Sequence, residues 1–553
     1  MTQGTAPPVV SGGGRLEAAR LKARQARRRY PATPVPQGAD HCEVVIIGAG
    51  PVGLALACEL RRYGVPVVLL DRNASSSDGS RAICWSKRSL EILDRHGIAD
   101  SMVAQGVTWN IGRVFEGAHL EPLYSFDLLP IKDQKFPAFV NLQQYHVEEA
   151  LVDVLARDSG VKLRWQHAVH SLTPATDGVT LGVEAPGGRY QLQARYVVAA
   201  DGHRSTIRDL MQLDFAGRTF EDNFLIADVR VETPFPAERR FYFNAPFNDG
   251  RTALMHQQPE GLWRLDFQLG WDIDREAAVS EPEVDRRVRA MLGPDTPFEY
   301  EWVSLYTFQC RRMERFVHDR VIFAGDAAHL VSPFGARGAN GGLQDADSLG
   351  WRLARVLRGE SSGALLDAYD EERCHGADEN LLNSSRATDF MTPRSPGARA
   401  LQAATLSLAT DHEFARSLIN SGRLSIPCSL AGTRTITPDP APIEWLGPRA
   451  GEVALDAPIR IGGQSGWLLP LLGPHFTCLC VNTAPPKTLP PDVKALVVGR
   501  DFDDPDGRLA ERYAGEGPAL YLIRPDQHVA ARFRQATAEQ LYTAWSRSLA
   551  LTP

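Results

Sequence analysis

The sequence lacks the cysteine patterns that build metal sites or disulfide frameworks. Its eight cysteines are scattered at positions 42, 58, 84, 310, 374, 428, 478 and 480, with no CxxC pair and no Cys/His group at zinc spacing. Such scattering indicates reduced thiols in a reducing compartment. We therefore predict that the protein has no metal site and is cytoplasmic.

Long apolar runs and an excess of basic charge are also missing. The uncharged stretch from Val44 to Cys58 is too short to cross a bilayer, so we expect no membrane span. The net charge of −7 gives no indication of a nucleic-acid partner. A hydrophobic content of 43% is typical of a globular protein, and 553 residues predict two or three domains.

The first forty residues have a different composition from the rest. Between Arg15 and Arg29 there are seven basic residues and one acid, Glu17, flanked by Gly- and Pro-rich stretches. No apolar segment of a secretory signal follows. A mitochondrial transit peptide is one alternative. We favour a mobile basic arm over residues 1–41, with a helix from Arg15 to Arg28.

A nucleotide-binding pattern follows this arm. Residues 43–47 form a β-branched apolar run typical of a buried strand, and the motif G-A-G-P-V-G occupies residues 48–53. Residues 54–63 then predict a helix, and residues 65–70 predict a second strand that ends at Asp71. This strand–loop–helix–strand–acid frame predicts a dinucleotide site, without distinguishing NAD from FAD.

Each residue type in this frame has a physical role. Gly48 permits the tight turn, Gly50 lets the backbone approach a pyrophosphate, and Gly53 lets helix and strand pack closely. The amides at the helix N-terminus face the phosphate charge. Asp71, 23 residues after Gly48, is expected to bind a ribose hydroxyl.

Two later motifs place an acid beside a glycine after a predicted strand. Strand-like residues 195–200 lead into D-G-H-R-S-T-I-R at 201–208, and residues 320–324 lead into G-D-A-A-H at 325–329. The carboxyl ends of such strands are where open α/β sheets bind ligands, although either motif alone is also compatible with a helix-capping turn. A glycine-rich turn at 333–342 then feeds a helix, whose N-terminus favours negative charge such as that of reduced flavin.

The order of these three motifs resembles the flavoprotein aromatic hydroxylases, the single-component group that includes p-hydroxybenzoate and phenol hydroxylases. The resemblance extends from about Cys42 to Glu379. It implies an α/β fold with a Rossmann-like FAD-binding domain interleaved with an antiparallel-sheet substrate domain. It also implies non-covalent FAD, NADH or NADPH as co-substrate, O₂, and a small aromatic substrate.

The resemblance also implies roles for individual residues. Asp326 would bind the ribityl chain, and the Asp201 motif would serve both FAD and NAD(P)H with help from Arg208. Arg81 would lie near the flavin, and Gln144 would contact FAD. Arg337 replaces a family glutamine and would add a cation either near the flavin pyrimidine or outside the turn. The full set of expected cofactor-binding residues is Gly48, Gly50, Gly53, Asp71, Arg72, Arg81, Gln144, Asp201, Gly202, Arg208, Gly325, Asp326, Pro333, Gly335, Gly338 and Asn340.

Residues 218–310 have the alternation and aromatic content of antiparallel strands and are expected to cover the flavin. They would form one wall of a mainly apolar cavity with a few polar groups. Tyr242, Gln258 and Arg264 are the candidates for substrate binding. His256 is the candidate base for deprotonating a phenol. For each of them the alternative is a surface residue or a polar residue satisfied within the strands.

The predicted organisation is an FAD-binding domain at 42–217 and 311–390, a substrate domain at 218–310, a helical connector at 391–442 and a final domain at 443–553. The stretch Y-L-I-R-P-D at 521–526 resembles the late hairpin of the thioredoxin-like domain in larger hydroxylases. We expect this domain to be structural, with a homodimer contact as one role. We expect Cys478 and Cys480 to point to opposite faces of one strand.

The resemblance implies hydroxylation of a phenolic ring through a flavin C(4a)-hydroperoxide, with the chemistry supplied by the cofactor. We favour a substrate like 3-(3-hydroxyphenyl)propionate. One alternative is a monooxygenase of the tetracycline type that tailors a polyketide or antibiotic. The other is an FAD-binding protein without turnover.

Overall fold

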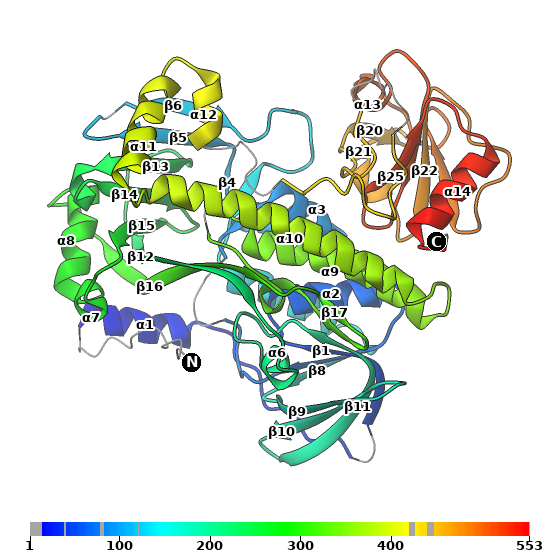
Figure 1. Ribbon diagram of the computed structural model, residues 1–553, viewed down its shortest axis with the longest axis horizontal. Coiled ribbons are helices and arrows are strands. Elements are labelled where there is room, and N and C mark those ends of the chain that lie inside the picture. The colour runs from blue at the N-terminus through cyan, green and yellow to red at the C-terminus, as the bar shows by residue number, and fades with distance from the viewer. Residues whose placement is uncertain are drawn as a thin grey trace.

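The computed structural model describes residues 14–37, 40–77, 82–119, 121–333, 335–419, 426–439 and 447–551. Figure 1 shows a lower sheet with helices, an upper-left sheet, and a C-terminal unit at the upper right. The long helix α10 (Ala364–Met391) runs across the first two and toward the third. Within the described residues, no helix is both long and apolar enough to cross a membrane.

The lower sheet is largely parallel. Its main path is β17-β18-β11-β1-β2-β8, with β1 parallel to both β2 and β11. Val44, Val45 and Ile46 of β1 are fully buried, as expected for a strand covered on both faces. Its strands are β1 (Asp40–Ile47), β2 (Val67–Asp71), β8 (Val161–Trp165), β9 (Ala168–Pro174), β10 (Val179–Ala185), β11 (Gly188–Ala199), β17 (Val317–His318) and β18 (Val321–Phe323).

Helices and a small sheet surround this parallel core. Helix α2 packs mainly on α9, and the strands β3, β7 and β4 form a three-stranded sheet beside them. The elements are α2 (Pro51–Arg62), α3 (Lys87–Asp94), α4 (Ala99–Gln105), α5 (Gln144–Leu155), α6 (Thr206–Leu210), α9 (Gly338–Leu357), β3 (Cys84–Ser86), β4 (Val107–Trp109) and β7 (Phe139–Asn141).

The second large sheet is almost entirely antiparallel and has the order β19-β16-β12-β15-β14-β13-β5-β6. Its two faces pack into two separate apolar clusters, one against α1 and α8 and the other against α11 and α12. Its strands are β5 (Ile111–Glu116), β6 (Tyr124–Asp127), β12 (Ala216–Arg230), β13 (Arg239–Ala245), β14 (Arg251–Gln257), β15 (Leu262–Gly270), β16 (Glu299–Arg312) and β19 (His329–Leu330). The flanking helices are α7 (Arg275–Ala278), α8 (Glu281–Leu292), α11 (Pro396–Ala409) and α12 (Glu413–Ile419).

The predicted N-terminal helix is present as α1 (Arg15–Gln25), but it is not part of a free arm. Leu16 and Ala19 are buried in the apolar cluster between the antiparallel sheet and α8, which we call the outer cluster. Arg15 forms ion pairs with Glu281 at 2.7 Å and Asp285 at 2.6 Å. The expectation of a mobile arm is therefore wrong for the described part of this segment, because its apolar stripe has a surface to bury against.

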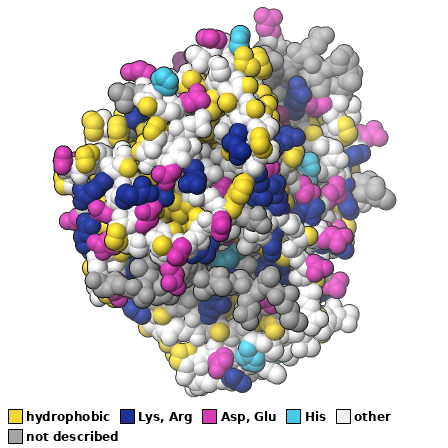
Figure 2. Space-filling model, turned by 60° about the vertical axis from the view of Figure 1, so that its left-hand side comes forward, with side chains coloured by type: hydrophobic (Ala, Val, Ile, Leu, Met, Phe, Trp, Pro, Cys, Tyr) yellow, Lys and Arg dark blue, Asp and Glu magenta, His cyan; other side chains and the backbone are white. Residues whose placement is uncertain are grey.

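Surface charge on this side of the molecule is mixed. Figure 2 brings the left side of Figure 1 forward and shows acidic and basic side chains interspersed over it. Interspersed charges of both signs give no extended field of one sign for a polyanion to follow.

The C-terminal unit contains a mixed four-stranded sheet in the order β23-β22-β24-β25. β22 and β23 are parallel, and the other neighbours are antiparallel. The relation to thioredoxin stays a prediction. The elements are β20 (Pro458–Ile461), β21 (Gln464–Trp467), β22 (Phe476–Val481), β23 (Val493–Val497), β24 (Ala519–Ile523), β25 (Val529–Phe533), α13 (Arg508–Tyr513) and α14 (Ala538–Ser548).

The expected arrangement of Cys478 and Cys480 is wrong. The two Sγ atoms lie 3.8 Å apart, and both side chains belong to the same apolar cluster, while Leu479 packs in another. Side chains alternate along a strand with a period of two, so residues i and i+2 share a face. Both thiols are free and buried.

A set of buried ion pairs joins the C-terminal unit to the rest of the protein. Arg524 donates to Glu372 on α10 at 2.8 Å and to Asp526 at 2.6 Å. Arg352 on α9 donates to the same Glu372 at 2.6 Å, and Trp351 Nε1 donates to Asp526 at 3.1 Å. These side chains are at most 1% exposed, so the docking surface is charged but fully enclosed.

Candidate cofactor and substrate site

Of the three glycines in the loop after β1, only Gly50 has open space beside its backbone. Gly48 has φ 107°, and a Cβ there would overlap the carbonyl oxygen of Ala200 on the neighbouring strand. A Cβ at Gly53 would overlap the Gly48 carbonyl oxygen. A Cβ at Gly50 would meet nothing within 4 Å, which is the open backbone that an approaching pyrophosphate requires.

Asp71 at the end of β2 holds this loop. Its Oδ2 accepts from the Ala49 N–H and its Oδ1 from the Asn73 N–H, both at 2.7 Å. Burial raises the pKa of Asp71, and the two backbone N–H groups oppose that effect. A carboxylate has about four acceptor sites, so the remaining lone pairs can still accept from a ribose. Arg72 beside it is exposed.

The second predicted motif lies at the end of β11. Oδ2 of Asp201 accepts from the Ile207 N–H at 3.3 Å, whereas Oδ1 is buried without a partner among the described residues. Burial raises the pKa of this carboxyl. Gly202 has φ 82°. An orphaned buried oxygen beside a nucleotide-type loop fits a hydroxyl or N–H group of a bound cofactor.

Arg208 ties the second motif to the third. Its guanidinium donates to the carbonyl of Ala327 at 3.0 Å and to that of His203 at 2.9 Å. Its charge also lies over the Phe215 ring at 4.2 Å. The side chain therefore fixes the loops after β11 and β18 relative to each other.

The third motif packs directly on the first. Gly325 has φ 61°, and a Cβ there would lie 2.9 Å from Cγ2 of Val52 on α2. A Cβ at Gly342 on α9 would lie 2.5 Å from the same methyl. Asp326 is half-buried, and a Cβ at Gly338 would lie 4.0 Å from its Oδ1. Loops predicted from segments nearly 300 residues apart thus meet at one edge of the parallel sheet.

A buried cluster that sequence reasoning missed supports this edge. Asp345 on α9 accepts from the Gly325 N–H and from His329 Nε2, each at 2.8 Å, and from Arg373 Nε at 2.6 Å. Burial would raise the pKa of Asp345, but the charges of His329 and Arg373 hold it at about 2. The available signal was an acid inside the apolar stripe of residues 343–357.

The glycine turn connects to the small sheet through Asn340. Its Oδ1 accepts from the Ser86 N–H at 3.0 Å, and its Nδ2 donates to the Cys84 carbonyl at 2.9 Å. Arg337 donates to Asn380 on α10 at 3.1 Å, so this contact points it toward α10. Pro333 and Gly335, with φ 99°, belong to the same turn.

The remaining cofactor predictions lie beside this turn. Arg81 falls outside the described residues. Gln144 Oε1 accepts from the Ala82 N–H at 3.2 Å, and its Nε2 donates to Glu148 at 2.8 Å. The described members of the predicted set therefore line one edge of the parallel sheet. With the open position at Gly50 and the orphaned oxygen of Asp201, they fit FAD.

The substrate candidates lie on the antiparallel sheet, but not all on one face. His256, Arg264 and Asp228 are successive cross-strand neighbours in register. Gln258 reaches the same Asp228 with its Nε2 at 3.4 Å. Tyr242 lies on the other face, where it stacks on Phe115 at 4.9 Å and packs into the outer cluster with α1 and α8.

Arg264 is already paired. Its Nε and Nη2 donate to the two oxygens of Asp228 at 2.7 and 2.8 Å, and both side chains are buried. Gln258 is fully buried, and its Oε1 has no partner within the described chain. The free acceptor makes Gln258 available to a ligand, whereas Arg264 serves the sheet.

His256 is buried with one ring nitrogen engaged. Its Nε2 lies 3.1 Å from Oδ2 of Asp266, and its Nδ1 has no hydrogen-bond partner among the described residues. Burial lowers the pKa of His256, but Asp266 and the neighbouring Cys84 raise it above its usual value overall. Nδ1, close to the Cys84 thiol, is the ring nitrogen that Asp266 does not engage.

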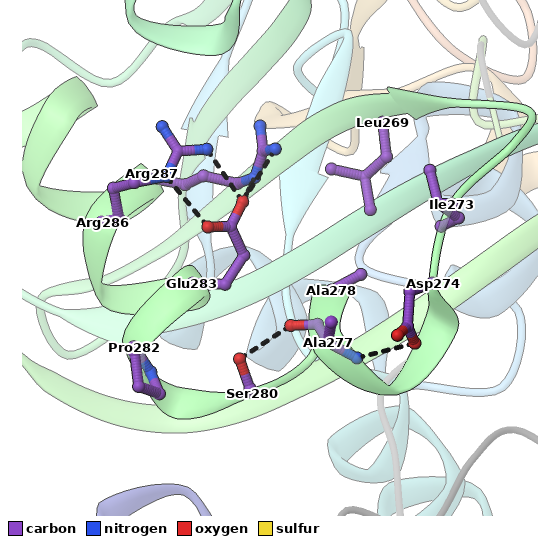
Figure 3. A pocket seen from close by; sticks show the side chains of 10 residues that line it. All are labelled: Leu269, Ile273, Asp274, Ala277, Ala278, Ser280, Pro282, Glu283, Arg286 and Arg287. Atoms are coloured by element: carbon purple, nitrogen blue, oxygen red, sulfur yellow. Dashed lines mark hydrogen bonds and ion pairs between the residues drawn. The ribbon is translucent and has the colours of Figure 1, made fainter.

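A surface pocket of about 570 Å³ lies elsewhere, around α7 and α8 (Figure 3). Leu269, which lines it, belongs to the outer cluster of the sheet and not to the His256 face. Glu283 pairs there with Arg286 and Arg287 at 2.8 and 2.9 Å. The pocket is therefore separate from the cofactor edge. In the described ranges, no group of three or more His, Cys, Asp or Glu side chains could hold a metal ion.

Comparisons with known proteins agree with this geometry. The FAD binding domain family matches residues 41–384. The chain is 33% identical over 408 residues, covering 70% of this chain and 78% of the relative, to the 12-dehydrotetracycline 5-monooxygenase/anhydrotetracycline 6-monooxygenase of Streptomyces rimosus subsp. rimosus. It is 31% identical over 365 residues, covering 64% and 60%, to the 3-(3-hydroxy-phenyl)propionate/3-hydroxycinnamic acid hydroxylase of Comamonas testosteroni.

Among solved structures, the fold is similar to that of the flavin-dependent monooxygenase PieE in complex with FAD and substrate. The TM-score is 0.76 with 22% identity, covering 94% of this chain and all of that one. At this identity the similarity concerns the fold alone.

Proposed function

Since the chain belongs to the FAD-dependent aromatic-ring monooxygenases, we propose that it hydroxylates a phenolic compound such as 3-(3-hydroxyphenyl)propionate. The observation that carries the proposal is a row of polar side chains on the antiparallel sheet, formed by His256, Arg264 and Asp228. The three-stranded sheet of β3, β7 and β4 joins this polar row to the glycine turn at residues 333–342. Asn340 binds the Cys84 carbonyl, and Asn141 on β7, paired with Cys84, donates to the Gln257 carbonyl at 2.7 Å. The His256 face is thereby held next to the cofactor edge.

FAD, when bound, supplies the oxygen activation, with NAD(P)H as the typical co-substrate of these enzymes. The glycine loop at residues 48–53 and Asp71 would hold the nucleotide part. Asp326, with the turn at 333–342, would hold the ribityl and pyrimidine part. The remaining task of the protein is to place the aromatic ring and exclude water from the reaction.

His256 is the side chain that we propose to face the hydroxyl or another polar group of the substrate. With Nε2 held by Asp266, only Nδ1 is available to exchange a proton or to donate a hydrogen bond. His256→Asn is expected to slow hydroxylation by about 10²–10⁴-fold while NAD(P)H oxidation continues. Coupling of oxidation to product at the wild-type level would remove His256 from this role.

A second candidate is a tailoring monooxygenase that acts on a polycyclic phenol. The similarity at 33% identity to an enzyme named for tetracycline precursors favours it. A panel of phenolic acids, simple phenols and polycyclic phenols separates the two, read by NAD(P)H oxidation and product mass. A protein that binds FAD without turnover would show no stimulation by any of them. A cytoplasmic location and a homodimer remain predictions.

A further inference from the structure

Arg239 at the start of β13 is a buried cation that has no carboxylate partner within the described residues. It is 3% exposed, and its Nε and Nη1 have no hydrogen-bond partner among the described residues. Burial lowers the pKa of Arg239, although a guanidinium stays protonated in proteins. Leaving a charged group buried and unpaired is costly, so such a group calls for an explanation.

The position of Arg239 extends the polar row by one strand. It is the register partner of His256 on β14, and His256 is in turn the partner of Arg264 on β15. Side chains at directly opposed positions have Cβ atoms about 4.5–5.5 Å apart. Three basic side chains therefore stand next to one another on a single buried face.

The carboxylates of this face are already committed. Asp228 binds Arg264 through both oxygens, and Asp266 binds His256 at 3.1 Å. Cys84 and then Asp266 attract the charge of Arg239, but neither forms an ion pair with it in the described part of the chain. The pairing leaves the positive charge of Arg239 on the face, next to the His256 ring, whose Nδ1 Asp266 does not engage.

An aromatic wall adjoins this charge. Phe241 lies two residues along β13 on the same face, with its ring 4.9 Å from the Arg239 guanidinium carbon. Phe126 from β6 lies 6.3 Å from the Phe241 ring. A planar ring bearing a negative oxygen would find both apolar contact and a counter-ion here.

We propose that Arg239 is a specificity-determining residue that binds an anionic oxygen, carboxylate or phenolate, on the aromatic substrate. The proposal rests on the proposed function for the identity of the ligand as an aromatic compound. When the imidazole is protonated, His256 Nδ1 supplies a second donor from the adjacent strand. Gln258 and Phe241 flank the anion on either side, so neutral phenols lack the contact that a charged one gains.

The rival explanation is internal neutralisation by Cys84. Burial raises the pKa of this thiol, but His256, Arg239 and Arg264 lower it below its ordinary value overall. If the thiolate were the permanent counter-ion of Arg239, no ligand charge would be needed. Replacing Cys84 by Ser then distinguishes the two, because the serine hydroxyl does not ionise.

The test uses the FAD-loaded protein and reads flavin absorbance during titration without NAD(P)H. The first probe pair is 3-(3-hydroxyphenyl)propionate and its methyl ester, which differ in the carboxylate. The second is 4-nitrophenol below and above its ionisation. Arg239→Met is expected to weaken binding of the charged probe about tenfold to a hundredfold and that of its neutral counterpart less than twofold. Arg239→Lys is expected to restore part of the affinity.

The matched control is Arg240→Met. Arg240 is the next residue on β13, points to the other face and pairs with Glu238 at 2.8 Å. It should leave the discrimination between charged and neutral probes intact. Cys84→Ser should leave it intact as well. A loss confined to the acid assigns a carboxylate, and a loss confined to ionised 4-nitrophenol assigns a phenolate.

The proposal is overturned if Arg239→Met binds both charged probes as wild type does. It is also overturned if neutral probes lose as much affinity, if Arg240→Met has the same effect, or if the wild type does not discriminate by charge. Discrimination that is absent in the wild type and appears only in Cys84→Ser would make the thiolate the counter-ion of Arg239, and it overturns the proposal too. Binding is read without turnover. A protein that selects anions through Arg239 yet hydroxylates no phenol would therefore refute only the proposed function.

Discussion

Buried arginines in two regions of this protein differ in whether a carboxylate compensates their charge. At the C-terminal interface, Arg352 and Arg524 lie fully buried against Glu372 and Asp526. On the antiparallel sheet, Arg239 is almost as deeply buried but has no carboxylate partner in the part of the chain that the structure describes. A deeply buried guanidinium is thus compensated by carboxylates at the C-terminal interface and not on the antiparallel sheet.

This difference distinguishes arginines that hold the fold together from an arginine that is suited to bind a ligand. A buried ion pair contributes modest net stability, but removing one partner leaves an uncompensated charge and costs several kcal/mol. An unpaired arginine has already incurred that cost in the ligand-free protein. An anionic ligand would offset that cost, so the position should favour anionic over neutral ligands. Substitutions in both regions test this difference.

Arg524→Met should have the largest effect. It leaves Glu372 and Asp526 with less compensation in a dry interface, so the free energy of unfolding should fall by about 3–5 kcal/mol. Arg239→Met, which removes an unpaired charge, should leave stability equal or increased. Urea unfolding of both variants checks the comparison. Equal losses in the two variants would break it.

Asp326→Ala tests the cofactor edge, where the relevant charge is only half-buried. Loss of a charge-assisted hydrogen bond to the ribityl chain should cost about 1.5–3 kcal/mol, or about tenfold to a hundredfold in FAD affinity. Stability of the FAD-free protein should change little. Fluorescence titration with FAD measures the effect, and an unchanged dissociation constant would assign Asp326 to helix capping alone.

Asp345 is a buried acid whose charge is compensated by Arg373 and His329, so it can be compared with the paired arginines. Its pKa is held at about 2 in the folded protein, below the ordinary 3.8, so it stabilises the fold above pH 4. That contribution, about 2 kcal/mol, should be lost as the pH falls from about 4 to 2. Asp345→Asn should flatten this part of the stability–pH curve. An unchanged acid limb would show that His329 and Arg373 do not act on it.

The smallest effect is expected for Cys478→Ser with Cys480→Ser. Both thiols lie within one buried cluster, so the double change buries two hydroxyls and should cost a modest amount of stability. FAD content and NAD(P)H oxidation should remain at wild-type levels. A variant that folds and holds FAD but no longer turns over would instead give the thiols a part in the reaction.

The loops at the ends of the parallel strands could be located from the sequence because their signals are local. The glycine spacing at residues 48–53, the acid at Asp71 and the order of the later motifs each follow from short segments with fixed backbone requirements. The helix over residues 343–357 followed from its apolar stripe. These local patterns do not predict which side chains from distant segments of the chain will contact these loops.

The substrate sheet was less predictable for that reason. Whether Tyr242 shares a face with His256 depends on the register between β13 and β14, which alternation within one strand does not give. Arg239 was overlooked because an unpaired charge is recognised only once all neighbours are placed. The error over Cys478 and Cys480 had a different origin, since the two-residue repeat of a strand already contained the answer.

The interface of Arg524 has a consequence for the timing of folding during synthesis. Glu372 on α10 finds this partner 152 residues later in the chain. Until residue 524 has left the ribosome, the helix that crosses both sheets carries a carboxylate without its full compensation. Contacts of such sequence separation form late, and the surface that awaits them is exposed meanwhile. The nascent protein should therefore keep this surface open to solvent until the hairpin around residues 524–528 emerges and closes over Glu372.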